Sequence, residues 1–184
     1  HDQQLRDNPA RGAPDGSDPA VPMTNPYAWQ WHQFDKSRPE NLAFLARLRE
    51  LVDQYPDTTM VGEIGDDDGL ARVAEYTGGG DKLHMAYTFN LLAEALDARQ
   101  IRQTVESVTT SIGDGWPCWS IGNHDAPRVL SRVSGADADP ALALVLLALM
   151  LSLRGSACVY QGEELALTEV DLRFDQLRDP YGIA

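Results

Sequence analysis

The sequence predicts an α/β fold in which helices cover a parallel β-sheet. Two observations lead to this prediction: four short apolar or β-branched segments alternate with segments of helical periodicity, and each of the four ends in polar residues. Alternation of this kind favours parallel strands joined by right-handed crossovers. It fits either an open, doubly wound sheet or part of a (β/α)₈ barrel.

The expected helices are marked by apolar periodicity and by the residues at their ends. Leucines and a valine recur at helical spacing over residues 39–55, where Pro39 occupies the first turn. Shorter helical patterns follow near residues 70–76 and 101–108. The last helix, over residues 141–153, begins after Asp139-Pro140 and ends at Arg154-Gly155, and its apolar composition predicts that it is buried.

Four segments rich in apolar and β-branched residues are expected to form strands, and they cover residues 58–64, 83–89, 116–121 and 157–161. Residues 1–36 precede them, and the five prolines up to Phe34 predict a long loop. Four aromatic residues between Tyr27 and Phe34 favour order in the second half of this loop, because aromatic side chains normally bury against something.

The residues that follow the strands decide between the two sheet types. The strand ends carry Glu63, Phe89-Asn90, Asn123-His124-Asp125 and Gln161-Gly162-Glu163-Glu164. Catalytic residues of (β/α)₈ barrels gather at the carboxyl ends of the strands. No glycine-rich phosphate loop follows any strand, which weakens the nucleotide-binding alternative. Because a closed barrel needs eight units and about 200 residues or more, four strands predict half a barrel.

Composition narrows the class of partner. A net charge of −13 argues against nucleic acid and anionic membranes, which require clustered Lys and Arg. The 13-residue apolar run 141–153 is shorter than the roughly 20 residues of a membrane-spanning helix. Cys118 and Cys158 each lie in an apolar run and are expected to be reduced core residues. No secretory signal is visible, so a cytoplasmic location is expected unless a signal peptide precedes His1.

Three segments resemble the α-glucosidase branch of the α-amylase family, glycoside hydrolase family 13. They begin VGEIGDDDGLARVAEY, GDGWPCWSIGNHDAPRVLSR and SACVYQGEELALTEVD. The resemblance runs over the whole chain, and it implies that residues 37–184 are βα units five to eight of the catalytic barrel. It also implies that residues 1–36 are the loop after strand four, and that the C-terminal β-domain of the family is absent.

The resemblance implies a retaining reaction on an α-linked glucoside or small oligosaccharide, by hydrolysis with possible glucosyl transfer. Glu63 would be the general acid/base, and Asp125 would hold the sugar hydroxyls and stabilise the transition state. Asn123 and His124 would bind the same sugar. Phe89 would line the leaving-group side, which the loop segment 8–32 would also shape.

The sequence departs from the family pattern in one respect. The family's nucleophile is an aspartate in a Gly-Phe-Arg-x-Asp type motif at the end of strand four, and this motif is absent. The resemblance therefore implies that the nucleophile, the first four strands and any structural calcium site lie outside the chain, with no cofactor in the segment itself. The missing half of the barrel would be its partner, and the chain alone is expected to be inactive.

Several alternatives remain open at this point. Asp66-Asp67-Asp68 suggests a calcium loop, but aligning Gly69 as the sixth loop position puts Ile64 at the first, where a ligand is required. These aspartates are instead expected to begin the next helix.

Other residues also allow two roles. Glu163 and Glu164 could be a catalytic pair, although a supporting role under the site is favoured. Arg128 could contact substrate or form a structural salt bridge. For the whole chain, a non-catalytic carbohydrate-binding or interaction protein is the main alternative, and a metal or phosphoryl hydrolase is a weaker one.

Overall fold

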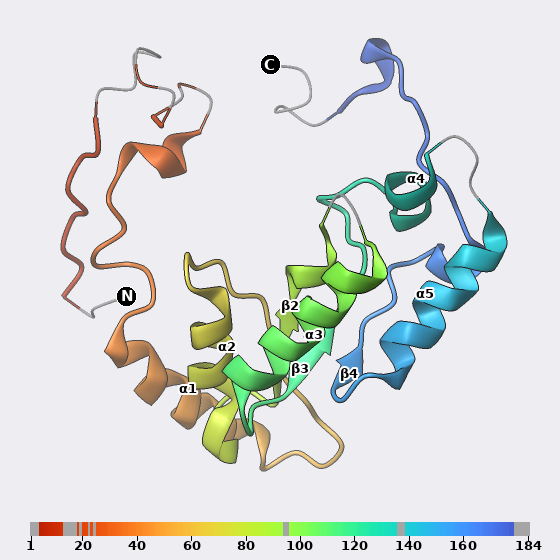
Figure 1. Ribbon diagram of the computed structural model, residues 1–184. Coiled ribbons are helices and arrows are strands. Elements are labelled where there is room, and N and C mark those ends of the chain that lie inside the picture. The colour runs from red at the N-terminus through yellow and green to blue at the C-terminus, as the bar shows by residue number, and fades with distance from the viewer. Residues whose placement is uncertain are drawn as a thin grey trace. The chain divides into compact units, whose positions relative to one another are not determined.

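A computed structural model describes residues 4–12, 18, 20–21, 23, 25–93, 96–135 and 139–178. The chain divides into two compact units, one made of His1–Ala43 with Val170–Ala184 and the other of Phe44–Glu169. The second unit contains the entire described sheet and the helices that pack on it (Figure 1).

Four parallel strands form the sheet. These are β1 (Val61–Gly62), β2 (Met85–Thr88), β3 (Pro117–Trp119) and β4 (Ser156–Ala157), in the order β1-β2-β3-β4. This confirms the predicted parallel α/β arrangement. The order follows the chain without the reversal that creates the switch point of doubly wound sheets. The described strands therefore have the sequential order expected for part of a (β/α)₈ barrel and not the order of a doubly wound sheet.

The strands are shorter than the sequence patterns suggested. Residues 58–60 were expected to belong to the first strand, but the Met60 N–H donates to His84 Nδ1 over 3.1 Å instead of to a neighbouring strand. Regular pairing begins only at Val61, opposite Met85. His84 is half-buried, and burial, followed by the charge of Arg49, lowers its pKa.

Five α-helices are described: α1 (Pro39–Val52), α2 (Gly69–Thr77), α3 (Ala98–Ile112), α4 (Val129–Ser134) and α5 (Pro140–Ser152). Aspartates cap three of them. Asp68 accepts from the Ala71 N–H, Asp97 from Gln100 and Asp139 from Ala141. The predicted start of the last helix is confirmed, whereas the short helix α4 was not predicted.

Short 3₁₀ turns connect or follow these elements: η1 (Pro26–Trp29), η2 (Gly78–Gly80), η3 (Phe89–Leu91), η4 (Glu163–Leu165) and η5 (Phe174–Gln176).

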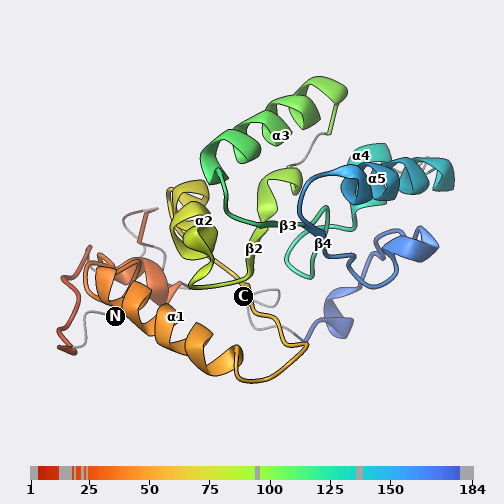
Figure 2. The same ribbon diagram turned by 90° about the horizontal axis from the view of Figure 1, so that it is seen from below.

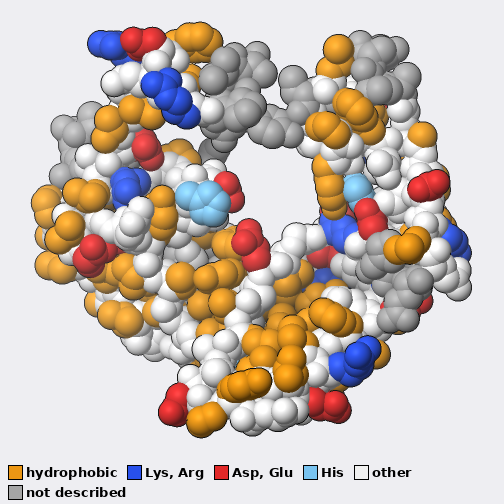
Figure 3. All heavy atoms as spheres, turned by 180° about the vertical axis from the view of Figure 1, so that it is seen from behind, with side chains coloured by type: hydrophobic (Ala, Val, Ile, Leu, Met, Phe, Trp, Pro, Cys, Tyr) orange, Lys and Arg blue, Asp and Glu red, His pale blue; other side chains and the backbone are white. Residues whose placement is uncertain are grey.

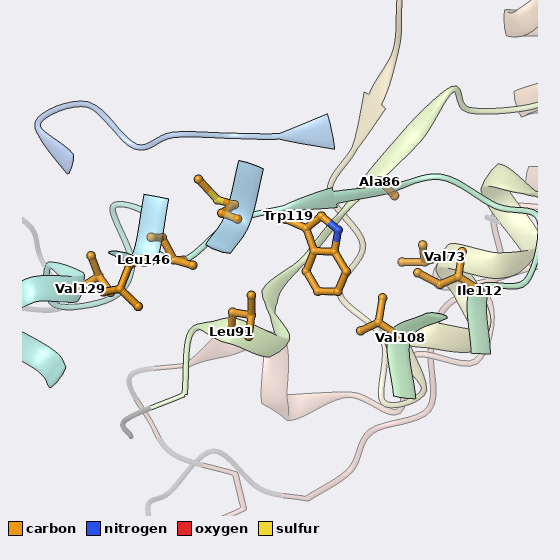
Figure 4. Packing of buried hydrophobic residues seen from close by; sticks show 10 residues of the cluster. Val73, Ala86, Leu91, Val108, Ile112, Trp119, Val129 and Leu146 are labelled. Atoms are coloured by element: carbon orange, nitrogen blue, oxygen red, sulfur yellow. The ribbon is translucent and has the colours of Figure 1, made fainter. Parts of the chain in front are cut away.

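Trp119 lies at the centre of the hydrophobic core. Its indole is 1% exposed, and Nε1 donates to the Arg154 carbonyl over 2.8 Å. Figure 4 shows the ring pointing from β3 into the space between Leu91 and Val108. Helices α2, α3 and α5 contribute Val73, Ile112 and Leu146 to the same cluster, and Figure 2 shows these three helices from below.

Helix α5 is buried on one face only. Ala143, Leu146 and Met150 are buried, but Leu144 and Leu151 are 67% and 68% exposed. The prediction of a buried helix therefore holds for one face of α5 and is wrong for the other, which has no packing partners among the described residues. Figure 3 shows that many other apolar side chains are also exposed. In the described part of the chain, no helix is long and apolar enough to cross a membrane.

Aromatic contacts order parts of the first unit. An antiparallel bridge joins Ala10 to Gln30, and the Arg11 guanidinium lies 4.8 Å from the ring centre of Trp31. His32 donates from Nδ1 to the Asp35 carboxylate over 2.9 Å and stacks on the Tyr27 ring. The expected burial of the aromatic side chains is wrong for two of the four, because Tyr27 and Trp31 are 58% and 51% exposed.

Replacing Trp119 by alanine tests the assignment of the core. Trp119→Ala removes a fully buried indole, and we expect it to lower the free energy of unfolding by about 3–5 kcal/mol. Trp31→Ala is the control, because Trp31 is 51% exposed, and we expect it to cost less than about 1 kcal/mol. Urea unfolding measures both values, and equal losses would contradict the assignment.

Candidate functional site

The carboxyl ends of all four strands line one cavity of about 370 Å³. The lining consists of Glu63 after β1, Tyr87 and Phe89 at the end of β2, Ser120, Gly122, Asn123 and His124 after β3, and Cys158, Val159, Tyr160 and Gln161 after β4. Side chains that are up to about 100 residues apart in sequence therefore share one pocket, because parallel strands end at the same edge of the sheet. The sequence-predicted residues Glu63, Phe89, Asn123 and His124 are all among them.

The end of β2 supplies an aromatic wall. Tyr87 and Phe89 lie on the same side of the strand, two residues apart, and their rings stack with centroids 5.7 Å apart. Cys158 Sγ and Tyr87 Oη share a hydrogen bond over 3.7 Å. This hydrogen bond, followed by burial, raises the pKa of Tyr87 to about 12, so the hydroxyl stays protonated. Sequence reasoning missed Tyr87, although its spacing of two from Phe89 was a usable signal.

Both cysteines are free thiols, as the sequence predicted. Cys118 is buried in β3, and burial raises its pKa to about 11. Cys158 is less buried and lines the cavity, so its role is not confined to the core.

The tip of the loop after β3 is largely exposed. The Asp125 N–H donates to Asn123 Oδ1 over 3.1 Å, which closes a local turn. His124 Nε2 lies 3.5 Å from Asp125 Oδ1, and the two side chains are 74% and 68% exposed. Asp125 is next to the lining residues of the cavity but is not one of them.

Arg128 is held by the neighbouring strand end. Its guanidinium donates to the Gln161 carbonyl over 2.9 Å and lies 5.2 Å from the ring centre of Tyr160. Its main-chain N–H donates to the Glu169 carboxylate over 2.9 Å. The salt bridge that was expected for Arg128 is not found among the described residues, where its guanidinium instead binds a carbonyl and lies over an aromatic ring.

Glu163 is buried beneath the loop after β3. Its Oε2 accepts from the Tyr160 N–H over 3.0 Å, while Oε1 has no hydrogen-bond partner among the described residues. Burial raises the pKa of this carboxyl. Glu164 is exposed and accepts from the Gly162 N–H over 2.8 Å. Both glutamates hold the turn after β4, which supports their predicted role under the site.

A second cavity of about 480 Å³ shares Tyr87 and Phe89 with the first and is lined by Asp66, Asp67 and Asp68. Asp68 caps α2, as expected for aspartates that begin a helix. Among the described residues, no group of three or more His, Cys, Asp or Glu side chains could hold a metal ion.

Gly122, in the loop after β3, lies directly against the buried side chain of Glu163. A Cβ at this position would overlap Glu163 Oε1. We therefore expect Gly122→Ala to displace one of them and to lower the free energy of unfolding by about 1–3 kcal/mol. At Gly65 a Cβ would meet nothing within 4 Å. Gly65→Ala is the matched control, expected to be neutral or to stabilise by up to about 1 kcal/mol. Thermal or urea unfolding compares the two, and a neutral Gly122→Ala would contradict the close contact.

The buried carboxyl of Glu163 makes stability depend on pH. Because its pKa is raised above the ordinary value of 4.5, the unfolded chain loses this proton first as pH rises. The stabilisation is present below pH 4.5 and declines as pH rises towards the pKa of the folded state. We expect wild type to lose stability relative to Glu163→Gln as pH rises above 4.5, measured by urea unfolding at each pH. Glu164→Gln is the matched control, and a difference that is constant with pH for Glu163→Gln would refute the burial effect.

Residues 8–183 match the family described as alpha amylase, catalytic domain. The chain is 45% identical to a probable alpha-glucosidase of Rhizobium meliloti (strain 1021), over 100% of this chain and 34% of that protein. It is 27% identical to Maltase A1 of Drosophila melanogaster, over 86% of this chain and 28% of that protein.

Solved structures agree with these relatives. The crystal structure of the alpha-glucosyl transfer enzyme XgtA superimposes with a TM-score of 0.80 at 50% identity, over 100% of this chain and 34% of that one. The trehalose-6-phosphate hydrolase of Bacillus licheniformis gives a TM-score of 0.67 at 25% identity, over 80% of this chain and 29% of that one. The chain thus spans about a third of the length of its relatives. It belongs to the alpha-amylase family of catalytic domains.

Proposed function

We propose that the chain forms the acid/base and sugar-binding part of a retaining α-glucosidase site. In this proposal residues 37–184 are βα units five to eight of a (β/α)₈ barrel, and residues 1–36 are the loop after strand four. The substrate is an α-linked glucoside or small oligosaccharide, and the glucosyl unit passes to water or to a second sugar.

The observation that carries the proposal is the shared cavity. Glu63 comes from the end of β1, and Asn123 and His124 come from the end of β3, yet all three line the same 370 Å³ pocket. This volume lies in the range of about 300–1,000 Å³ typical of small-molecule sites. Aromatic side chains with a few convergent polar groups are the lining expected for a sugar pocket.

The chemistry follows from the groups that converge there. Glu63 as an acid protonates the oxygen of the glycosidic bond, so that the leaving group departs as a neutral alcohol. Glu63 as a base then takes a proton from the attacking water or sugar hydroxyl. His124, Asn123 and Asp125 hold the hydroxyls of the glucosyl ring, and Asp125 stabilises its positive charge in the transition state. Phe89 packs against the leaving group.

The nucleophile of this reaction lies outside the 184 residues. A retaining glycosidase needs a second carboxylate about 5–5.5 Å from the acid. The Gly-Phe-Arg-x-Asp type motif that carries this aspartate in the family is absent from the chain, which spans only about a third of its relatives' length. The remaining half of the barrel is therefore the proposed partner of this segment, and it would also hold any structural calcium.

Glu63→Gln in the protein expressed from the complete reading frame tests the acid/base role. We expect kcat/KM for maltose to fall by about 10²–10⁴-fold, because an amide cannot protonate the leaving sugar. With 4-nitrophenyl α-glucoside the loss should be much smaller, because 4-nitrophenolate departs without protonation. Steady-state kinetics on the two substrates gives both ratios.

Two controls accompany this measurement. Glu50→Gln changes an exposed glutamate of α1 and should leave both rates unchanged. The 184-residue chain alone should release no 4-nitrophenol, because it lacks the nucleophile. Equal losses on both substrates would contradict the acid/base role. A complete protein that binds but does not cleave α-glucosides would favour the non-catalytic alternative.

A further inference from the structure

We propose that Arg132 is a positioning residue that fixes the loop carrying Asn123, His124 and Asp125 against the segment that follows β2. This inference rests on the proposed function, because it assigns the loop a role in holding the sugar.

The guanidinium of Arg132 binds four main-chain carbonyls. Nη2 donates to Ile121 over 2.7 Å and to Leu91 over 3.3 Å. Nη1 donates to Pro127 over 3.1 Å, and Nε donates to Ala93 over 2.9 Å. One side chain thus joins two segments that follow neighbouring strands of the sheet.

Two of the four carbonyls lie at opposite ends of the loop that carries Asn123, His124 and Asp125. Ile121 precedes it and Pro127 follows it, so the guanidinium spans the base of the loop. The other two, Leu91 and Ala93, follow Phe89, which lines the cavity. Arg132 therefore sets the distance between the loop and the Phe89 segment without contacting the pocket itself.

The loop depends on support from below. At its tip His124 and Asp125 are exposed, and the turn is closed by the Asp125 N–H to Asn123 Oδ1 bond. A local bond of this kind shapes the tip but does not anchor it to the sheet. Under the loop, buried Glu163 lies against Gly122 and limits movement towards the core.

Arginine is suited to this position and lysine is not. A guanidinium presents five N–H donors in a fixed plane, whereas an ammonium is a single flexible point. Burial lowers the pKa of Arg132, and the negative charge of Glu163 opposes this effect. The guanidinium of Arg132 is thus partly shielded from water, and the four main-chain carbonyls accept the hydrogen bonds that water would otherwise accept.

Arg154 provides a matched control at the other end of the sheet. It also donates to three carbonyls, those of Gly113, Asp114 and Gly115, over 2.9–3.4 Å. These residues precede β3, so Arg154 holds the amino end of the strand, away from the cavity. A purely structural role predicts the same behaviour for both arginines.

Arg132→Lys and Arg154→Lys in the complete protein separate the two roles. We expect Arg132→Lys to lower kcat for 4-nitrophenyl α-glucoside by about 10²-fold, the cost of a displacement near 1 Å, with a much smaller change in KM. Arg154→Lys should lower the melting temperature to a similar extent but leave kcat within about twofold of wild type. Unchanged kcat in Arg132→Lys, or equal losses of kcat in both variants, would overturn the proposal.

Amide hydrogen exchange in the complete protein gives an answer that is independent of turnover. Arg132→Lys should speed exchange in residues 121–127 by about 10-fold, and Arg154→Lys should not affect this segment. If wild-type complete protein cleaves no α-glucoside, the proposed function fails, while exchange still reports whether Arg132 orders the loop. Unchanged exchange at 121–127 in Arg132→Lys would overturn the positioning role.

Discussion

The parallel pairing of four short strands is the constraint on which the site depends. Each strand has only two to four residues in regular pairing, yet the register brings Gly62, Thr88 and Trp119 to one edge. The residues that follow them line one cavity. The buried indole of Trp119 packs β3 into the same cluster as side chains of α2, α3 and α5, so core packing and site geometry are determined by the same strand (Figure 4).

Polar groups beneath the site are held mainly by the main chain. Arg128 precedes α4 and binds one carbonyl after β4, whereas Arg132 lies within α4 and binds carbonyls that follow β2 and β3. Glu163 is held by a main-chain N–H and faces Gly122. A buried polar group is expensive unless its partners are in place. Such groups therefore favour one arrangement of the loops over others.

Much of this arrangement could be predicted from the sequence. Alternating strand and helix patterns, the aspartate caps and the polar strand ends pointed to a parallel sheet with Glu63 and Asn123-His124 at one edge. Strand lengths were overestimated because the apolar pattern does not show where a side chain accepts a main-chain hydrogen bond. His84 does so for the Met60 N–H. The role of Arg132 depends on contacts with residues 39 and 41 positions away, which local periodicity does not report. The one-sided burial of α5 depends on which partners its second face has, which composition alone does not determine.

The central claim is that the strand ends β1 to β4 form the pocket for a glucosyl ring. A crystal structure of the protein from the complete reading frame, bound to a glucose-shaped iminosugar, tests it most directly. We expect the iminosugar ring to lie within hydrogen-bond distance of His124 and Asp125, with Glu63 beside the position of the leaving oxygen. An iminosugar bound elsewhere, with this pocket empty, would contradict it.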